Sequence, residues 1–245
     1  MTNTPALTFS KDGLTLKSRV QPFNITDFKL IAFDMDSTLI NIECIDEIAN
    51  VVGLRDEVAH ITALTMSGEI KDFKESLRKR VALLKGTPQS ALKQVYEQRL
   101  KLNHGAQRLL DTCRTAGLKS LLVSGGFTYF AERVQSLLQI DFTRSNELEI
   151  EDGFLTGHLS PQDWGVICDG EEKKRMLIKT CNELGIGLNQ AIAVGDGSND
   201  IPMMLACSKG GGLSVAYHAK PIVKEQALIC IESGGLDRML ELFNF

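Results

Sequence analysis

Three short apolar runs, each ending in a polar turn, constrain the fold of this chain more than any other feature. They are LIAF (30–33), LKSLLVSGG (118–126) and AIAVGDG (191–197). A continuous apolar run bounded by polar residues is typical of a strand buried on both faces. Helical patterns that stop at Gly117 and Gly185 precede the second and third runs. The repeated order of strand, turn and helix predicts an α/β fold, with a parallel sheet between helices.

A long helix-rich stretch separates the first two runs. Its helical patterns are ECIDEIANVVG, DFKESLRKRVALLKG and TPQSALKQVYEQRLKL, the last with Thr87 as the predicted N-cap and Pro88 as the first helical residue. A simple βαβ crossover does not need this much chain. We therefore predict a helical cap inserted over residues 41–103, and an α/β core made of residues 1–40 and 104–245.

Other segments give weaker signals. ELEIEDGFLTGH (147–158) alternates around Asp152 and Gly153, which predicts a β-hairpin at the sheet edge. LICI (228–231) predicts a further strand, and residues 236–243 a C-terminal helix. Glycines 210–212 indicate a flexible loop near the functional site. LTFSKDGLTL (7–16) fits either a short hairpin or a tail.

Composition excludes several classes of function. The 27 Lys and Arg do not outnumber the 31 Asp and Glu, so the chain is a poor candidate for binding nucleic acid or an anionic membrane. No segment approaches the roughly 18 apolar residues of a membrane span, and no secretory signal pattern is visible at the N-terminus. Six scattered cysteines without a CxxC pair predict reduced thiols. We therefore expect a cytoplasmic protein with no nucleic-acid or membrane partner.

Polar residues follow each apolar run where the predicted strand stops. Ligands of open α/β sheets bind at the carboxyl ends of parallel strands. Two close carboxylates need a compensating positive charge to stay ionised, and Mg²⁺ takes one or two carboxylates together with waters and substrate phosphate. A lone DxD is usually a solvated turn, but here three strand ends converge. The converging residues are Asp34 and Asp36, then Ser124, Gly125 and Gly126, then Asp196, Asn199 and Asp200.

Phosphate-binding groups accompany these carboxylates. The Ser124 hydroxyl and the glycine N–H groups stand at a strand-to-helix turn, a position that favours anions. Lys173 or Lys174, near the start of the next predicted helix, can reach a phosphate as a point charge. Either lysine alone could equally be a solvated charge. The set suits phosphoryl transfer through a carboxylate nucleophile, with a second carboxylate as general acid and base.

The motifs DMDST, VSGG, a downstream lysine and GDGSND, in this order, resemble those of the haloacid-dehalogenase-like phosphohydrolases. DMDSTLINIECIDEIA, DFKESLRKRVALLKG, VSGGFTYF, NELEIEDGFLTG and YHAKP resemble in particular the members that hydrolyse O-phospho-L-serine. The resemblance covers roughly residue 28 to the C-terminus. It implies a Rossmann-like core and Mg²⁺-dependent hydrolysis of phosphoserine through an aspartyl-phosphate, the last step of serine biosynthesis.

The resemblance also implies roles for the matching core residues. Asp34 would be the nucleophile, and Asp36 the general acid and base with its backbone carbonyl on Mg²⁺. Asp34 and Asp196 would be the carboxylate ligands of the metal. Ser124 and Gly125 would hold the phosphate, Asn199 would contact it, and Asp200 would support the site. Lys173 is preferred to Lys174 because its distance to GDGSND fits the family.

In the cap, the resemblance implies that Glu43 binds the substrate ammonium, Arg80 binds its carboxylate and Phe73 helps to exclude water. A zwitterionic amino acid needs one anion and one cation, and Arg suits a carboxylate bidentately. The residues alone favour ordinary surface roles, since Glu is favourable at a helix start and RKR is usually a solvated face.

Ser198 departs from the family pattern, which usually has Ala there. Three alternatives stay open: hydrolysis of another small phosphomonoester, transfer of the phosphoryl group to an alcohol such as homoserine, and a non-catalytic binding protein. The intact motifs disfavour the last. We expect a small-molecule substrate and a monomer or homodimer.

Overall fold

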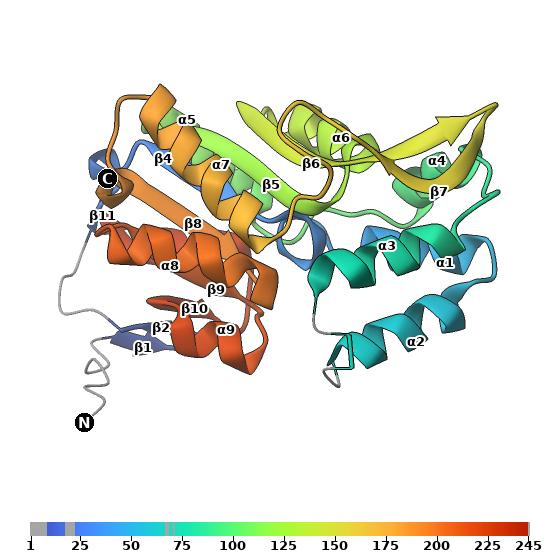
Figure 1. Ribbon diagram of the computed structural model, residues 1–245. Coiled ribbons are helices and arrows are strands. Elements are labelled where there is room, and N and C mark those ends of the chain that lie inside the picture. Colours follow the sequence, from blue (N-terminus) through green and yellow to red (C-terminus); the bar gives the residue numbers. More distant parts are fainter. Residues whose placement is uncertain (1–8, 18–22, 67–68, 71, 245) are drawn as a thin grey trace.

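A computed structural model describes residues 9–17, 23–66, 69–70 and 72–244. Within these ranges, a nine-stranded sheet runs in the order β1-β2-β10-β9-β8-β4-β5-β6-β7 (Figure 1). The strands from β10 to β6 are mutually parallel, whereas β1, β2 and β7 pair antiparallel at the two edges. The predicted parallel α/β fold is confirmed. The strands are β1 (Phe9–Lys11), β2 (Leu14–Leu16), β4 (Leu30–Phe33), β5 (Lys119–Phe127), β6 (Phe142–Glu151), β7 (Phe154–Ser160), β8 (Ala191–Gly195), β9 (Leu213–Tyr217) and β10 (Ile229–Ile231).

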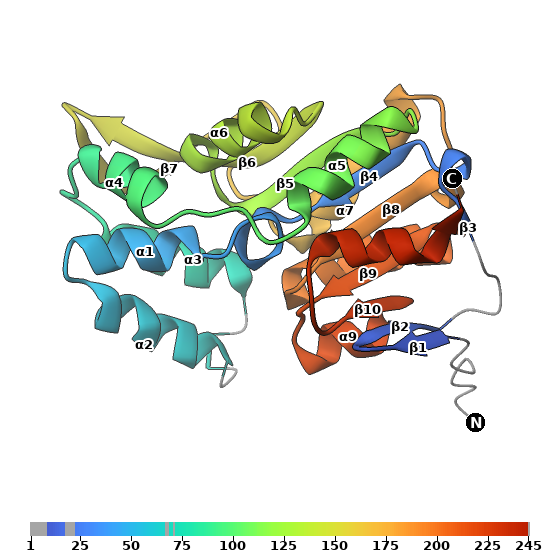
Figure 2. The ribbon, with the colours of Figure 1, turned by 180° about the vertical axis from the view of Figure 1, so that it is seen from behind.

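Helices cover both faces of this sheet. One face carries α5 (Ala106–Thr115), α6 (Thr128–Leu138) and a 3₁₀ helix at Leu236–Leu242 (Figure 2). The opposite face carries α7 (Gly170–Glu183), α8 (Ile201–Lys209) and α9 (Pro221–Gln226) (Figure 1).

The central strand β4 explains why its sequence is apolar throughout. Side chains alternate across a strand, so Leu30 and Ala32 pack into the cluster under α7 and α8. Ile31 and Phe33 pack into the larger cluster on the other face. All four side chains are buried, as expected for a strand covered on both faces.

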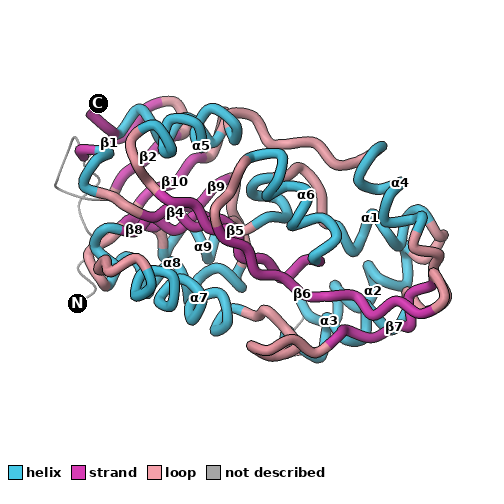
Figure 3. The backbone as a smooth tube through the Cα atoms, turned by 90° about the horizontal axis from the view of Figure 1, so that it is seen from above, coloured by secondary structure: helices cyan, strands magenta, loops and turns pink. Residues whose placement is uncertain are grey.

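Between β4 and α5, four helices gather at one end of the molecule (Figure 3). They are α1 (Cys44–Val51), α2 (Arg55–Met66), α3 (Phe73–Leu83) and α4 (Ser90–Gln98). The sequence analysis missed α2, whose weakly patterned sequence RDEVAHITALTM places Val58 in the core. The division into a core and a cap at residues 41–103 stays a prediction.

The predicted start of α4 at Thr87 and Pro88 was wrong. The helix begins at Ser90, because the preceding residues pair with the edge strand β7 instead. The Gly86 N–H donates to the Leu155 carbonyl at 2.8 Å, and the Leu155 N–H donates to the Thr87 carbonyl at 2.9 Å. This pairing fixes the helical segment to the β6–β7 hairpin.

The β6–β7 hairpin is confirmed. Asp152 and Gly153 form its turn with φ values of 50° and 82°, which suit the right-handed twist of the flanking strands. The hairpin extends beyond the sheet and packs over α3 (Figure 1). It therefore supports the inserted helices from one side.

The glycine run at 210–212 does not lie near the site, contrary to the prediction. A Cβ on Gly212 would meet the backbone oxygens of Leu188 and Ala191, where β8 begins. The reason is topological: α8 begins just after β8 ends and runs back to the opposite edge of the sheet. The residues that follow form β9, which the sequence analysis did not predict.

The two chain ends also differ in part from expectation. The predicted C-terminal helix is a 3₁₀ helix that ends at Leu242, after which β11 (Phe243–Asn244) pairs with β3 (Phe23–Asn24). Phe243 packs there against Phe23 and Phe28, and this aromatic cluster favours an extended end. Of the two alternatives for residues 7–16, the short hairpin is confirmed by the antiparallel pair of β1 and β2. Residues 7–8 lie outside the described residues. No helix in the described part of the chain is long and apolar enough to cross a membrane.

Truncating the sheet core is expected to cost stability. Leu122 of β5 is 0% exposed, so Leu122→Ala is predicted to lower the free energy of unfolding by about 2–5 kcal/mol, measured in urea. Leu137→Ala on α6, where the side chain is 51% exposed, is the matched control and is expected to cost much less. Equal costs for the two variants would contradict the assigned core.

Candidate active site

A cavity of about 670 Å³ lies at the carboxyl edge of the sheet, between the strand ends and the inserted helices. Because β4 lies between β8 and β5, the polar turns after these three strands meet there. Lys173 and Asp200 do not line this cavity but are buried beside it. The predicted site residues that line it are Asp34, Asp36, Glu43, Phe73, Arg80, Ser124, Gly125, Asp196 and Asn199.

Asp34 directly follows β4, and only one of its two carboxylate oxygens is hydrogen-bonded by described residues. Its Oδ1 accepts hydrogen bonds from the Met35 N–H and from the Lys173 ammonium, each at 2.7 Å. No hydrogen bond from a described residue reaches its Oδ2, so this oxygen is available to a substrate or a metal. Burial, followed by the negative charge of Asp200, raises the pKa of Asp34 well above its usual range.

Lys173 projects from the first turns of α7 into the core and is 0% exposed. Its ammonium lies 2.7 Å from Asp34 Oδ1 and 2.7 Å from Asp200 Oδ1. Burial alone lowers the pKa of a lysine, but the two carboxylates outweigh it and raise the pKa of Lys173. Lys174 instead points outward and pairs with Glu171 at 3.1 Å. The structure therefore brings Lys173, and not its neighbour, into the site.

The start of α7 is placed by two local features. Asp169 is the N-cap residue, and its Oδ1 accepts the Glu172 N–H at 2.9 Å. Gly170 allows a close approach, because a Cβ there would lie 2.9 Å from the Asn199 carbonyl oxygen. The helix that carries Lys173 thus packs directly on the turn after β8.

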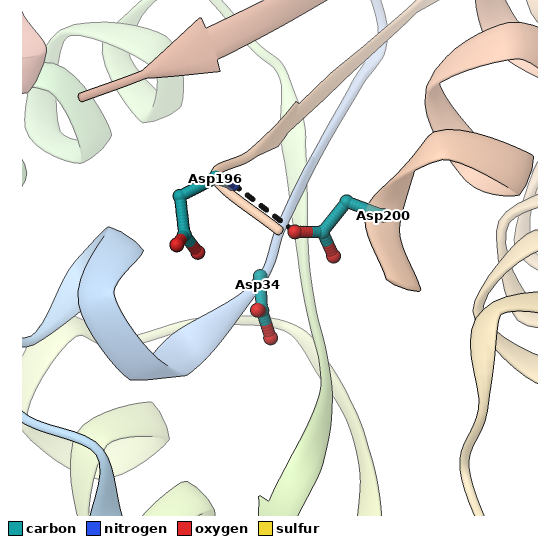
Figure 4. Close-up of side chains that lie close together, drawn as sticks. All are labelled: Asp34, Asp196 and Asp200. Atoms are coloured by element: carbon teal, nitrogen blue, oxygen red, sulfur yellow. Dashed lines mark hydrogen bonds between the residues drawn. The ribbon is translucent and has the colours of Figure 1, made fainter. Parts of the chain in front are cut away.

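The turn after β8 is organised by Asp200. Its Oδ2 accepts the Asp196 N–H at 3.1 Å (Figure 4) and the Gly197 N–H at 3.0 Å, while its Oδ1 binds Lys173. Asp196 is left facing the cavity, where its Oδ1 accepts a hydrogen bond from the Thr38 hydroxyl at 3.2 Å. Burial, followed by Asp200, raises the pKa of Asp196 to about 7.

Asp36 is turned toward the first inserted helix. The chain leaves β4 through a tight turn in which Asp36 is extended and Ser37 has a positive φ of 58°. Asp36 Oδ2 accepts the Cys44 N–H at 3.0 Å at the start of α1. Burial and then the charge of Glu43 raise the pKa of Asp36 to about 7. A carboxyl group with such a pKa can both give and take a proton near neutral pH.

The turn predicted to bind phosphate is a bulge in β5. Val123 pairs with Arg144 and Phe127 with Asn146, so the register shifts between them and the intervening residues bow out of the ladder. The Ser124 hydroxyl accepts the Gly126 N–H at 2.9 Å.

Asn146 secures this bulge and was missed by the sequence analysis. Its amide donates to the Gly125 carbonyl at 2.7 Å and accepts the Cys168 N–H at 2.7 Å. Fully buried, it ties the β5 turn to the segment before α7. Nothing in the local pattern NELEIEDG, which only indicates a hairpin, distinguishes this residue.

The inserted helices bring charged and aromatic groups to the same cavity. Phe73, the first residue of α3, lies so close to the β5 turn that a Cβ on Gly125 would be 3.1 Å from its Cζ. Glu43 Oε1 accepts the Ser37 hydroxyl at 2.7 Å. Arg80 Nε and Asp46 Oδ1 are both buried without a hydrogen-bond partner among the described residues. Such groups need a partner, and a polar ligand in the cavity could supply it.

The acidic cluster fits a hard divalent cation. Carboxylate oxygens of Asp34, Asp196 and Asp200 lie within 4.8 Å of one another. Asp200 is already occupied by Lys173 and two N–H groups, which leaves Asp34 and Asp196 as carboxylate ligands. Burial, followed by the negative charge of Asp200, raises the pKa values of Asp34 and Asp196 even though Lys173 lies beside them. An oxygen-binding cation such as Mg²⁺ would supply the missing charge.

Comparisons with known proteins agree with this chemistry. The family model for haloacid dehalogenase-like hydrolases matches residues 31–205. The chain is 60% identical over 230 residues to a phosphoserine phosphatase of Polaromonas sp., covering 94% of this chain and 96% of the relative. It is 59% identical over 231 residues to a phosphoserine phosphatase of Albidiferax ferrireducens, again covering 94% and 96%.

Solved structures give the same result. The fold is similar to that of a phospho-aspartyl intermediate analogue of phosphoserine phosphatase, with a TM-score of 0.79 and 39% identity. This match covers 89% of the present chain and 99% of the other. A substrate-bound phosphoserine phosphatase complex matches with the same TM-score, identity and coverage.

Without a divalent cation, stability should fall as the pH rises. Folded Asp36 and Asp196, with pKa values of about 7, retain protons that an unfolded Asp releases near pH 4. Their favourable contribution is therefore present at low pH and is lost through about pH 7. In EDTA, Tm is expected to drop by at least about 3 °C between pH 5 and pH 8.

The Asp196→Asn variant, which cannot ionise at this position, should reduce that drop. Asp111→Asn on the exposed side of α5 is the control and should leave the wild-type profile unchanged. A Tm that is constant or rises over this pH range would contradict the assigned charge imbalance.

Proposed function

Because this chain belongs to the haloacid dehalogenase-like hydrolases, we propose that it is a phosphoric monoester hydrolase that converts O-phospho-L-serine and water into L-serine and phosphate. One observation carries the proposal. One cavity is lined by the Asp34 carboxylate and by the β5 turn with its hydroxyl and N–H groups. The same cavity is lined by the Glu43 carboxylate and the Arg80 guanidinium, whose charges suit an amino acid.

In the first step, the Asp34 carboxylate attacks the phosphorus atom of the substrate. The bond between phosphorus and the serine oxygen breaks, and Asp36 gives its proton to that oxygen. Lys173 holds Asp34 through Oδ1, which directs Oδ2 into the cavity. The products of this step are serine and a phosphorylated Asp34.

In the second step, water attacks the phosphorus atom of this acyl phosphate. Asp36, now a carboxylate, takes the proton of the water, and the bond between phosphorus and the Asp34 carboxylate oxygen breaks. Phosphate leaves and both aspartates return to their initial states. The Ser124 hydroxyl, the N–H groups of the β5 turn and the Asn199 amide hold the phosphoryl oxygens in both steps.

We propose that the metal is Mg²⁺, which the Asp34 and Asp196 carboxylates and the Asp36 backbone carbonyl would hold. When bound, it neutralises charge on the phosphoryl oxygens and on the crowded carboxylates. Asp200 orients this site without ligating the metal, since its oxygens are already occupied.

The inserted segment at residues 41–103 would act as a cap that selects the substrate. Arg80 binds the serine carboxylate and Glu43 its ammonium group, while Phe73 over Gly125 excludes water. The buried Arg80 Nε, which has no partner within the described residues, gains one when the carboxylate binds. The enzyme would work as a monomer or homodimer in the cytoplasm.

Phosphate release from L-phosphoserine and from a panel of small phosphomonoesters tests this function, with MgCl₂ and with EDTA. A strong preference for phosphoserine that EDTA abolishes and MgCl₂ restores is expected. Activity on other esters alone would retain the core chemistry and reject the cap assignments. Phosphoryl transfer to added homoserine without net phosphate release would make the chain a phosphotransferase.

The nucleophile assignment predicts the effect of Asp34→Asn. An amide cannot form the acyl phosphate, so turnover of phosphoserine should fall by at least about a thousandfold. Tm should change little, because the amide is isosteric with the carboxyl group and Lys173 keeps its ion pair with Asp200. Asp111→Asn serves again as the control with normal turnover, and substantial activity in Asp34→Asn would refute the assignment.

The cap assignment predicts a substrate-dependent effect of Arg80→Ala. Loss of the guanidinium should raise KM for phosphoserine by about tenfold or more, since a charged hydrogen-bond partner is removed. The effect on phosphoethanolamine, which lacks the carboxylate, should be small. Lys79→Ala, an exposed neighbour that pairs with Glu75, is the control. Equal increases of KM for both substrates would show that Arg80 does not bind the carboxylate.

A further inference from the structure

Cys44 makes a contact that the proposed mechanism does not use. Its Sγ lies 3.1 Å from Asp36 Oδ1, while its own N–H donates to Asp36 Oδ2 at 3.0 Å. One residue therefore holds both oxygens of the proposed general acid and base. From this geometry we infer that Cys44 is a positioning residue, whose thiol sets the orientation of the Asp36 carboxyl group for proton transfer.

Two contacts restrict the carboxyl group more than one. The N–H bond alone fixes Oδ2 at the start of α1 but allows the carboxyl plane to rotate about it. The second contact, at Oδ1, defines that plane. The backbone of Asp36 is extended, and that of the next residue, Ser37, is left-handed. The chain around Asp36 is therefore an unusual turn and not a regular helix or strand. A second contact to the side chain matters at such a position, because misplacement of a catalytic group by about 1 Å can lower the rate a hundredfold.

A thiol suits this task for a chemical reason. It is a weak hydrogen-bond donor and a weak acceptor. As a donor it can orient the Asp36 carboxylate, and as an acceptor it competes poorly for the proton when Asp36 is protonated. That proton stays available for the serine oxygen. Burial and the neighbouring charge of Asp36 raise the pKa of Cys44 well above its ordinary value, so the sulfur keeps its hydrogen.

The other cysteines make the contact of Cys44 distinctive. All six cysteines are buried and unpaired. Cys207 contacts the backbone oxygens of Ala191 and Leu213, and Cys230 that of Lys224. Cys113 packs in the apolar core. Among the hydrogen bonds of the described residues, the thiol of Cys44 is the one that meets a side-chain carboxyl group.

The inference rests on the proposed function for its kinetic consequence but not for its structural one. We would compare the wild-type enzyme with Cys44→Ala, which removes the thiol, and Cys44→Ser, which keeps a donor at the same place. Cys113→Ala is the matched control, since it also removes a buried sulfur from the core.

With phosphoserine and MgCl₂, Cys44→Ala should lower kcat by about three- to tenfold with little change in KM, and Cys44→Ser should recover most of the loss. The Cys113→Ala variant should retain the wild-type kcat. An equal loss in Cys44→Ala and Cys44→Ser, or a matching loss in Cys113→Ala, would assign the effect to packing.

The leaving group separates positioning from a general loss of activity. The p-nitrophenolate ion leaves without a proton, so the first-turnover rate with p-nitrophenyl phosphate should be unchanged in Cys44→Ala, whereas the first-turnover rate with phosphoserine should fall. Equal reductions of both rates would overturn the inference.

Crystal structures of the variants test the same point without any substrate. The Asp36 carboxyl plane should be retained in Cys44→Ser and rotated or disordered in Cys44→Ala. An unchanged Asp36 in Cys44→Ala would refute the positioning role even for an inactive protein. An inactive wild-type enzyme with the expected rotation would refute only the proposed function.

Discussion

The buried ammonium of Lys173 is the interaction on which the rest of the site depends. It lies 2.7 Å from one oxygen of Asp34 and 2.7 Å from one oxygen of Asp200, and no part of it reaches solvent. A buried charge is tolerated only when it is paired and hydrogen-bonded. The pairing therefore holds together the end of β4, the turn after β8 and the start of α7. Breaking a buried pair of this kind typically costs about 3–5 kcal/mol.

Even with this interaction, the described residues at these strand ends carry more carboxyl groups than ammonium groups. Lys173 engages Asp34 Oδ1 and Asp200 Oδ1. Burial, followed by the charge of a neighbouring carboxylate, raises the pKa values of Asp36 and Asp196 to about 7. This excess is what a divalent cation requires. It also explains why we propose that Asp200, although acidic and close, supports the site without ligating the metal. The excess of negative charge and the proposed metal site thus involve the same carboxylates.

The inserted helices complete the site because they contact the core at several separate points. Phe73 lies over the β5 turn, Cys44 holds Asp36 at the start of α1, and residues 86–89 pair with the β6–β7 hairpin. These contacts join the residues proposed to select the substrate to the proposed catalytic groups. They also explain why α4 begins later than its N-cap signal predicts: the hairpin competes for the same backbone groups.

By itself, the sequence determined the α/β class, the three main strands, the hairpin and most of the chemical groups of the site. Those features depend on local patterns: apolar runs, turn residues and strand ends. The resemblance to the family already favoured Lys173 over Lys174, and in the structure Lys173 is the lysine that points inward. Only the tertiary structure placed Asn146 and Cys44 against the site and moved the glycine run to the opposite edge of the sheet. The physical reason is that local patterns define which elements form, whereas the direction of each side chain depends on how elements distant in the sequence pack together.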